Sequence, residues 1–529
     1  MDAAVAPVAG ASQPSRIRPR RPPAVLLALA CAVAAAVLLP VVFLGIEAAH
    51  TGWPQVSRVL FRSLTARLLT DTVELALCVT ALCAVLGTAA AYTTERTDLP
   101  LRRMWSTLIV VPLAIPDFIV GYTWSSIAPS LHGLTGAVLV MTLSLNPLVY
   151  LPVAAALRNT DPGLEEAARS LGLGPWAVFR RVTLRQVRPA LLGGCLMVCL
   201  ALLAEYGAFE IMRFQTFTTE IFTQFEVGFS ASTACALSIV LVLLALAVLA
   251  GQHYANGRAR VARASGTRRP PVRHRLGLHA VWVTLGAAAL AVLSLGVPVA
   301  TLGYWLGQPD TTTLPAIASV PSATVTTLLY ALLAAAAATV LAVPVALLVE
   351  RHRSPVAVLL ERGTLIVQGL PGMVIAMSLV FFAERFAFGL YQSPVLMIAA
   401  YAVLFFPLAL VSVRASAAQA PARLEQLGRS LGRRPAAVLL RVTLPLLAPG
   451  IAAGFCVVFL SVVTELTATL VLLPAGVRTL ATQFWAFQND ESYAAAAPYA
   501  AAMVALAVIP GYLLGTWFDR RSSDNRSAV

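Results

Sequence analysis

The sequence contains no lysine. Lysine and arginine together number 38 among its 529 residues, so all of these basic residues are arginine. A P-loop of the GxxxxGK[ST] type needs a lysine to reach the nucleotide phosphates, and the sequence has no such motif. The chain therefore lacks the phosphate-binding loop of a conventional ATPase, and we expect any ATP hydrolysis to take place on another subunit.

Charged residues are scarce, at 12% of the chain against 59% hydrophobic residues. Soluble proteins carry about 25% charged residues. Apolar runs of roughly 20 residues recur, which is the length a helix needs to cross a bilayer. The runs are continuously apolar and do not alternate, so they predict spanning helices and not the strands of a membrane barrel. The predicted fold class is an all-α integral membrane protein.

Cysteine and histidine are also few. The seven cysteines all lie in apolar runs and form no CxxC pair, so we expect small buried apolar side chains. None of the six histidines falls deep inside an apolar run, which argues against a histidine metal site within the membrane. No catalytic constellation is recognisable, so the sequence predicts neither an enzyme nor a cofactor bound by this chain.

The apolar runs predict about twelve membrane spans. Their ranges are 24–46, 72–93, 104–127, 134–157, 189–208, 231–252, 279–305, 322–349, 363–383, 394–414, 448–472 and 493–517. The first run follows four arginines, as a signal peptide would, but its apolar stretch is too long for a typical signal core. We therefore expect it to be a span.

Arginine is distributed unevenly between the two sides that these spans define. With the N-terminus in the cytoplasm, the opposite side holds only Arg58, Arg62, Arg67, Arg213, Arg385 and Arg478. Short cytoplasmic loops of membrane proteins are enriched in arginine and lysine. The pattern predicts a multi-pass plasma-membrane protein with both termini in the cytoplasm. The net charge of +14 then reports topology, and no nucleic-acid partner is expected.

The chain divides into two similar halves. A linker at 253–278, rich in arginine and containing Pro270 and Pro271, separates a first half at 24–252 from a second at 279–517, with tails at 1–23 and 518–529. The run LEEAARSLGLGPWAVFRRVTL from Leu164 aligns without a gap to LEQLGRSLGRRPAAVLLRVTL from Leu424. This internal repeat predicts a duplication of six spans, with the copies related by an axis along the membrane normal.

The repeated runs lie in two polar cytoplasmic loops, at 158–188 and 415–447. In the first, Asp161 is a suitable N-cap, and Glu165 and Glu166 follow in the first helical turn, where the helix dipole favours acids. Gly172 should interrupt the helix, and a second short helix should begin near Pro175. A simple connector also needs caps and polar residues, but it has no reason to recur in both halves. The repetition therefore indicates a docking site for a partner.

Here the sequence resembles the permeases of binding-protein-dependent ABC importers, of type I. Their signature is EAA, three residues, Gly, nine residues, an aliphatic residue, one residue and Leu-Pro. The matching residues are Glu166, Ala167, Ala168, Gly172, Val182 and Leu184 in the first loop and Gly432, Val442, Leu444 and Pro445 in the second. Arg185 replaces the proline of the first copy. Gln426-Leu427-Gly428 replaces the EAA triplet of the second, which leaves Glu425 as the nearest acid.

The resemblance implies that both loops couple to an ATPase. Two copies of a cytoplasmic ABC ATPase, which use ATP and Mg, would dock on these residues together with Glu165, and an extracytoplasmic solute-binding protein would deliver the substrate to a bacterial inner-membrane complex. The departures predict that the two docking sites are unequal.

Three acids within the predicted spans are candidates for the translocation path: Asp117, Glu205 and Glu465. Charged groups inside a membrane are costly and often functional. Gly372 is the repeat counterpart of Asp117, and Pro116 and Pro371 mark matching helix irregularities. The alternative is that these acids only pair with neighbouring groups and hold helices together.

The segments AEYGAFEIMRFQTFTTEIF from Ala204 and TELTATLVLLPAGVRTLATQFW from Thr464 resemble bacterial ferric-iron permeases, which are fused chains of this kind. Ferric iron is therefore the expected substrate, with thiamine, phosphonate or another small solute as alternatives. An outer loop with Glu210, Glu220 and Glu226 could attract a cation, dock the binding protein or be merely solvated. A gradient-driven secondary transporter is the alternative class, although it has no need of two docking loops.

Overall fold

The computed structural model describes residues 23–160, 162–226, 228, 231–256, 273–308, 313–352 and 354–508. Asp161 as an N-cap, Pro270 and Pro271 of the linker, nearly all of the N-terminal tail, most of the linker and the C-terminal tail lie outside these residues. The described part is helical apart from loops and one isolated bridge between Thr97 and His274.

The helices of the first half follow in an order that the second half repeats. They are α1 (Ala24–Thr51), α2 (Trp53–Leu60), α3 (Ser63–Arg96), α4 (Arg102–Val110), η1 (Val111–Ala114), α5 (Asp117–Ile127), α6 (Gly133–Arg158), α7 (Pro162–Ser170), α8 (Pro175–Val178), η2 (Phe179–Thr183), α9 (Leu184–Ala204), α10 (Gly207–Ile211), α11 (Phe217–Glu226) and α12 (Ala231–Asn256).

The helices of the second half are α13 (His279–Ala291), η3 (Val292–Gly296), α14 (Val297–Leu306), α15 (Thr313–Arg351), α16 (Pro355–Ile366), η4 (Val367–Gly369), α17 (Gly372–Phe386), η5 (Phe388–Leu390), α18 (Pro394–Leu404), α19 (Phe406–Gln419), α20 (Ala422–Ser430), α21 (Pro435–Val438), η6 (Leu439–Thr443), α22 (Leu444–Val463), α23 (Thr467–Leu472) and α24 (Leu480–Asn489). The apolar helix Tyr493–Val508 follows them.

The predicted all-α membrane fold is confirmed. In the described part of the chain, eight helices are each long and apolar enough to cross a membrane, and three bent pairs qualify when each pair is counted as one span. The helix Tyr493–Val508 is shorter than a span, and the rest of the predicted twelfth span lies outside the described residues.

Several predicted spans are not straight, which corrects the sequence-based ranges. The third, 104–127, bends by 94° before Asp117, and the ninth, 363–383, bends by 107° before Gly372. Pro116 and Pro371 stand at these breaks, where a proline cannot donate the backbone hydrogen bond that a continuous helix requires. The tenth, 394–414, bends by 53° just before Pro407 for the same reason.

Two further spans end earlier than predicted. The predicted fifth and eleventh spans, 189–208 and 448–472, stop at Ala204 and Val463, and the chain continues into the short helices α10 and α23. Glu205 is the first residue outside the helical conformation at the end of α9, with φ −75° and ψ 138°.

The first helix of each half packs on the other half. α1 contacts α15, α16 and α17 of the second half, whereas α13 and α14 contact α4 and α5 of the first. The remaining spans pack mainly within their own half, with α3 and α9 against α6 and with α15 and α22 against α19. The exchange of first helices joins the two halves over long stretches of apolar surface.

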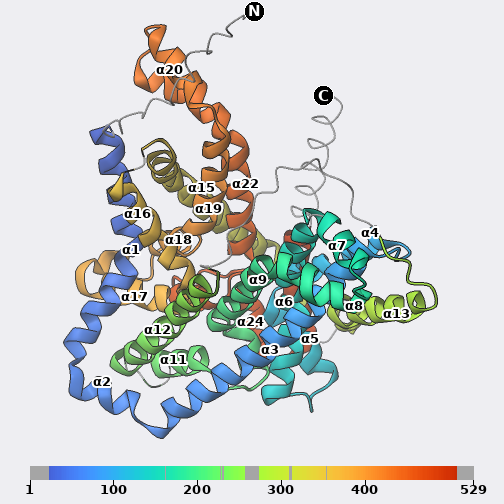
Figure 1. Cartoon of the computed structure of the whole chain (residues 1–529). Coiled ribbons are helices and arrows are strands. Elements are labelled where there is room, and N and C mark those ends of the chain that lie inside the picture. Colours follow the sequence, from blue (N-terminus) through green and yellow to red (C-terminus); the bar gives the residue numbers. More distant parts are fainter. Residues whose placement is uncertain are drawn as a thin grey trace, which may run out of the picture.

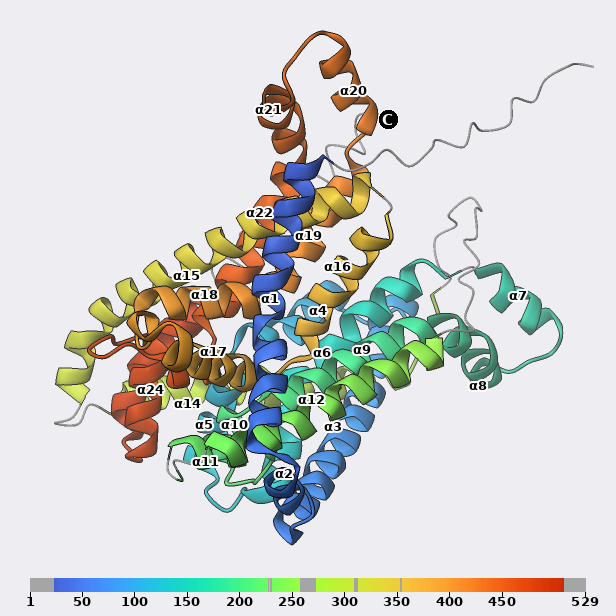
Figure 2. The same cartoon turned by 90° about the vertical axis from the view of Figure 1, so that its left-hand side faces the viewer.

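The two halves diverge toward the ends that carry α7 and α20. These two helices lie far apart in both Figure 1 and Figure 2, which defines the loop end of the molecule. At the opposite end, α10, α11, α14 and α24 lie together (Figure 2). The halves therefore meet at one end and are splayed at the other.

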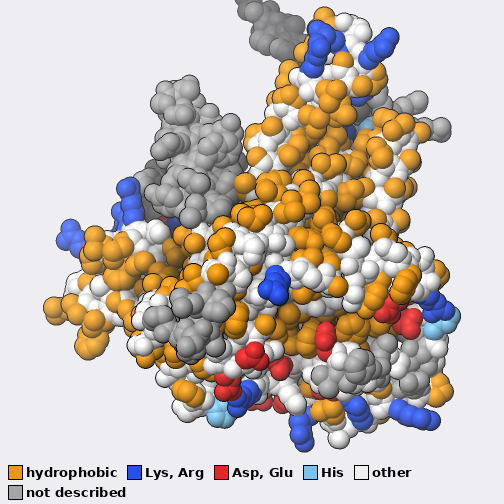
Figure 3. Space-filling view, turned by 180° about the vertical axis from the view of Figure 1, so that it is seen from behind, with side chains coloured by type: hydrophobic (Ala, Val, Ile, Leu, Met, Phe, Trp, Pro, Cys, Tyr) orange, Lys and Arg blue, Asp and Glu red, His pale blue; other side chains and the backbone are white. Residues whose placement is uncertain are grey.

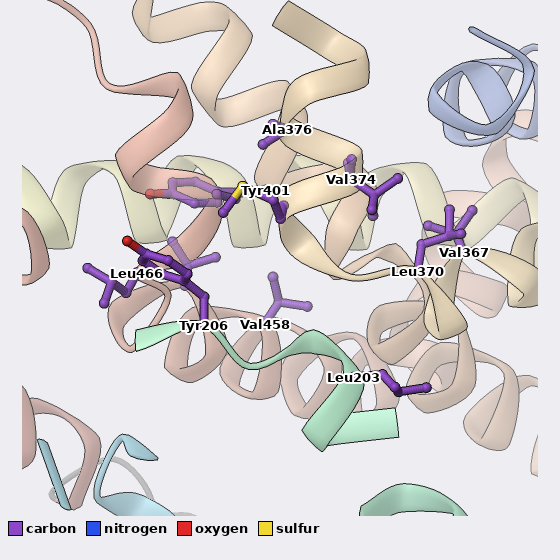
Figure 4. Packing of buried hydrophobic residues seen from close by; sticks show 14 of the residues in the cluster. Leu203, Tyr206, Val367, Leu370, Val374, Ala376, Tyr401, Val458 and Leu466 are labelled. Carbon is purple, nitrogen blue, oxygen red and sulfur yellow. The ribbon is translucent and has the colours of Figure 1, made fainter. Parts of the chain in front are cut away.

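Apolar side chains from both halves meet where α9 and α22 end. Figure 4 shows Tyr206 of the first half beside Leu466 of the second, with Tyr401 and Val374 nearby. The backbone is close here, because a Cβ built at Gly207 would lie 2.7 Å from Leu466 Cδ2. Glycine at this position therefore allows the two halves to touch.

Candidate functional site

The first predicted docking loop forms a helix, a glycine turn and a second helix. α7 ends at Ser170, and Gly172 adopts φ +83°, which a residue with a side chain rarely does. The amide of Leu173 donates to the carbonyl of Ala168 at 3.1 Å and closes the helix end. The predicted second short helix is wrong in one respect: from Pro175 the chain runs as one helical rod to Ala204.

Both copies contain a π-helical turn at the same place in the repeat, Phe179–Thr183 and Leu439–Thr443. The sequences FRRVT and LLRVT there end in a threonine that is buried in each copy. Such turns are rare in proteins, and those that do occur are often found at functional sites. The repeated distortion joins each predicted docking loop to the span that follows it, and the sequence alone did not reveal it.

The predicted docking residues of the first loop differ in whether they are buried or exposed. Glu165 and Ala168 are buried, whereas Glu166, Ala167 and Gly172 are exposed. Val182 and Leu184 are half-buried at the start of the following span. The surface that a partner can reach on α7 is therefore formed by Glu166, Ala167 and the exposed tip at Leu171.

Glu165 pairs inside the protein. Its Oε1 lies 3.4 Å from Nη2 of Arg96, whose side chain is fully buried at the end of α3, and it accepts a hydrogen bond from the Thr183 hydroxyl at 2.9 Å. The Arg96 guanidinium also donates to the Thr160 hydroxyl. Glu165 thus connects the docking helix to a spanning helix and to the π-helical turn.

The second loop repeats this connection. Arg351, at the end of α15, donates from Nη2 to Glu425 Oε1 at 2.9 Å and from Nη1 to the Ala417 carbonyl at 3.2 Å. Here both side chains keep some exposure, 15% and 13%. Gly432 repeats the turn with φ +76°, Val442 and Leu444 are half-buried, and Pro445 is exposed. Gln426, Leu427 and Leu431 form the exposed surface.

The end of the linker adds a contact to the first loop. His274 Nε2 lies 2.8 Å from Arg169 Nη2, and its backbone bonds to the carbonyl of Arg96 and the amide of Asp98. The imidazole also stacks on Tyr92. Arg429, the repeat counterpart of Arg169, is exposed and forms no ion pair with any residue the structure describes. The two docking sites therefore differ in their support as well as in their sequence.

The three candidate path acids lie near the junction of the halves. Glu205 interacts electrostatically with both Asp117 and Glu465. Glu205 Oε1 accepts from the amide of Ala208, and Glu465 Oε1 accepts from the amide of Ala468, each at 2.8 Å. Each glutamate thus caps the short helix that follows it. In the described part of the chain no group of three or more His, Cys, Asp or Glu is arranged to hold a metal ion.

The breaks in the third and ninth spans place Asp117 and Gly372 at equivalent positions, each as the first residue of a helix after a proline. A Cβ built at Gly372 would lie 3.3 Å from Glu465 Oε1. The repeat thus supplies a carboxylate at one of the two positions, and at the other a glycine that packs closely against the Glu465 carboxylate.

Polar contacts close the end opposite the loops. Arg213 of the first half pairs with Glu491 of the second at 3.1 Å, and the Tyr122 hydroxyl donates to the Tyr493 carbonyl at 2.6 Å. A cavity of about 550 Å³, lined by both halves, lies at these residues. The acidic side chains visible in Figure 3 lie in the lower part of this face, among several basic side chains. Sequence reasoning identified none of these contacts between the halves.

Of the three acids in the predicted outer loop, Glu220 is buried and paired. It lies 3.2 Å from Arg62 and accepts from Gln224 at 2.8 Å. Glu210 lines the cavity between the halves. The simple picture of a wholly solvated loop is therefore wrong for Glu220.

The family model for "Binding-protein-dependent transport system inner membrane component" matches residues 84–261 and again 338–524. The chain belongs to this family. It is 36% identical over 499 residues to the "Fe(3+)-transport system permease protein FbpB 2" of Haemophilus influenzae, covering 94% of this chain and 99% of the relative. A sulfate permease of Synechocystis, CysW, is 29% identical over 40% of this chain and 84% of its own length. The molybdenum permease ModB of Escherichia coli is 28% identical over 30% of this chain and 80% of its own.

Proposed function

We propose that this chain is the permease of an ATP-driven importer that moves ferric iron into the cytoplasm. The observation that supports this most directly is the similarity, over nearly the full length of both chains, to an Fe(3+)-transport permease of Haemophilus influenzae. The sulfate and molybdenum relatives match only part of this chain. The protein itself is a transport subunit and not an enzyme.

The energy comes from a partner. The sequence has no lysine and hence no conventional P-loop, so two copies of an ABC ATPase bind ATP and Mg and dock on the two loops. Glu166 and Leu171 on one side, and Gln426 and Leu431 on the other, are the exposed residues at those positions. The splayed loop ends are the parts that nucleotide-driven closure of the ATPases would bring together (Figure 2).

The loop end faces the cytoplasm, and the opposite end receives the solute-binding protein. This orientation follows the excess of arginine in the loops on that side. With the outer ends joined and the loop ends apart, the structure corresponds to an inward-facing state (Figure 1, Figure 2). Opening of the Arg213–Glu491 contact accompanies the change to the outward-facing state.

The path runs past Asp117, Glu205 and Glu465. Carboxylate oxygens suit hard cations, and Glu205 lies within electrostatic range of both Asp117 and Glu465. Because each glutamate uses one oxygen to cap a helix, the other oxygen is the one that can face a passing ion. The acids bind the passing cation weakly and transiently, one after another, and do not form a stable binding site.

The decisive experiment measures ATP hydrolysis and radioactive iron uptake by the permease reconstituted with its ATPase and binding protein. We expect that only the iron-loaded binding protein stimulates ATP hydrolysis, and that iron uptake depends on ATP. Stimulation only by a binding protein loaded with thiamine or a phosphonate would keep the importer class and exclude iron. Uptake that follows an ion gradient without any ATPase would instead support a secondary transporter.

A further inference from the structure

A large apolar groove lies beside the first predicted docking loop, where His279 at the start of α13 of the second half also lines it. Its volume is about 980 Å³, and its walls come from α3 on one side and from the α8–α9 rod on the other. The lining includes Ala84, Val85, Ala89, Trp176, Phe179 and Leu191. None of the candidate path acids and none of the contacts that close the outer end belongs to it.

The groove extends along a helix that is long and apolar enough to span a membrane. It extends from Trp176 back to Ala84, which precedes the end of α3 by twelve residues, or about 18 Å along a helix axis. Val85, in its wall, is 67% exposed. The loop end of α3 lies near α8, with α13 of the second half close by (Figure 1). An apolar site of this length beside a spanning helix suits a lipid better than a protein docked on α7.

Arginines are concentrated beside this groove and not at the equivalent place in the second half. Arg180, Arg185 and Arg188 of the first copy correspond to Leu440, Pro445 and Ala448 of the second. All three arginines are exposed, and none forms an ion pair with a described residue.

The helical spacing places two of these arginines along the groove. Arg188 is four residues after Leu184 and three before Leu191, and both leucines line the groove. Arg180 follows the lining residue Trp176 by four residues. The second copy, with apolar side chains at both positions, lacks this combination of groove and charge.

We propose that the groove binds an anionic phospholipid of the cytoplasmic leaflet. The acyl chains lie between α3 and α9, and Arg180 and Arg188 beside the groove, with Arg185 near them in the chain, supply the positive charge that attracts the phosphate of the head group. Basic sites between spanning helices on the cytoplasmic side are suited to anionic head groups, and arginine forms paired hydrogen bonds with phosphate. Trp176 is 71% exposed, and tryptophan is a residue type enriched at membrane interfaces.

The proposal rests on the orientation proposed above, because anionic lipid is concentrated in the cytoplasmic leaflet. It gives a reason for the arginine at position 185, where the family signature has proline. The lipid would stabilise the position of the helix from Pro175 to Ala204, which follows the first docking loop. Binding of the ATPase at the first docking site should then depend on the lipid composition of the membrane, whereas binding at the second should not.

The test uses phosphatidylglycerol and phosphatidylcholine with identical brominated acyl chains, which quench tryptophan fluorescence on contact. The full chain is reconstituted in nanodiscs, and the signal of Trp176 is isolated by difference from the Trp176→Phe variant. We expect stronger quenching by brominated phosphatidylglycerol than by brominated phosphatidylcholine at equal content. Equal quenching by both lipids would overturn the charge-selective site.

The double variant R180L/R188A, which takes the residues of the second copy, should reduce the lipid preference about fivefold for each arginine removed. The matched control R433L/R434G takes residues of the first copy in the exposed second loop and should leave the preference unchanged. An equal loss in both variants would contradict the site and indicate a nonspecific surface charge.

The third variant, A89W, fills the groove and should lower the retention of both lipids, measured by native mass spectrometry on monodisperse protein. Unchanged retention would show that the acyl chains do not occupy the groove. Because this readout does not depend on iron or on the ATPase, a failure here leaves the proposed importer function standing.

Discussion

Nη2 of Arg96 lies 3.4 Å from Oε1 of Glu165, and this ion pair joins the end of a spanning helix to the docking helix α7. The repeat places Arg351 and Glu425 in the same relation, at 2.9 Å. In each half an ion pair therefore connects the predicted docking helix to the end of the second span. The acid that makes this connection precedes the EAA triplet, whereas the glutamate of the triplet, Glu166, points outward.

Removal of one partner of the buried pair should destabilise the first half strongly. R96A leaves the Glu165 carboxylate with only Thr183 and Arg169 near it, and such a loss costs about 3–5 kcal/mol when the pair is buried. The midpoint of thermal unfolding of the purified protein measures the effect. R158A is the matched control, because Arg158 pairs with Glu95 but is 59% exposed, and it should cost about 0–1 kcal/mol. Similar losses in both variants would contradict the structural role.

Glu166 should act on coupling and not on stability. E166A removes an exposed carboxylate from α7, so the unfolding midpoint should stay unchanged while association with the ATPase weakens about tenfold, as expected for the loss of a charged hydrogen bond. Q426A, at the equivalent position of the second loop, should have a smaller effect because it removes no charge. Titration of ATPase binding to the reconstituted permease measures both. Equal defects would argue against unequal docking sites.

The helical fold and the repeat could be predicted from the sequence because apolar length and internal similarity are local signals. Continuous apolar runs identified the spans, and two copies of RSLG and RVTL located the docking loops. The positions of Pro116 and Pro371 correctly indicated irregular helices. Their bends of 94° and 107° could not be predicted, because a proline removes a hydrogen bond without fixing the direction of the next helix.

The sequence could not predict which of the two neighbouring glutamates is buried and which is exposed. Glu165 and Glu166 are neighbours in sequence, but successive residues of a helix point about 100° apart, so one is buried and the other is exposed. Which one is buried depends on Arg96, a residue far away in the chain. The contact of His274 with Arg169 could not be predicted for the same reason, because nothing in the composition of the linker indicates that His274 lies against α7. Long-range pairing decides both cases.

The contact between His274 and Arg169 should make the first docking site sensitive to pH. Burial, followed by the Arg169 guanidinium, lowers the pKa of His274 below its ordinary value of 6.5, while Glu165 opposes this effect and Arg96 adds to it. The neutral imidazole accepts from Arg169, so the contact contributes fully above pH 6.5 and is lost as the pH falls through the lowered pKa. ATPase stimulation by the complex should decline in that acid range.

The variant H274Q offers a neutral acceptor that does not titrate in this range, so its ATPase stimulation should be less sensitive to acid. R169A should remove the same pH response, whereas R429A, at the counterpart position without the contact, should preserve it. An unchanged acid response in H274Q would show that another group is responsible.

Glu205 and Glu465 allow their structural and transport roles to be separated. In E205Q the amide oxygen can still accept from the Ala208 amide, so the cap is retained and the charge is lost. E205A loses both, with a cap contribution of about 0.5–2 kcal/mol. If the charge attracts the passing cation, E205Q and E465Q should fold normally and lower ferric iron uptake about tenfold or more. Normal uptake by E205Q would leave these acids with a structural role only.

Two glycines at equivalent places in the repeat should respond differently to alanine. A Cβ at Gly194 would lie 2.8 Å from Val149 Cα and 2.9 Å from the Leu148 carbonyl oxygen, so α9 would have to move away from the backbone of α6. A Cβ at Gly454 would lie 3.3 Å from Ser412 Cβ and 3.4 Å from the backbone of Ala409, which needs only a small shift. In a helix the replacement itself gains about 0.5–1 kcal/mol.

We therefore expect G454A to be nearly neutral in the free energy of unfolding. G194A should lose about 1–3 kcal/mol, because overpacking against the backbone exceeds the gain in helix propensity. The two unfolding midpoints, measured in the same detergent, test this difference. Equal midpoints would contradict this prediction. They would mean that α9 can move away from α6 without an energetic cost, so that the close approach at Gly194 does not contribute to stability.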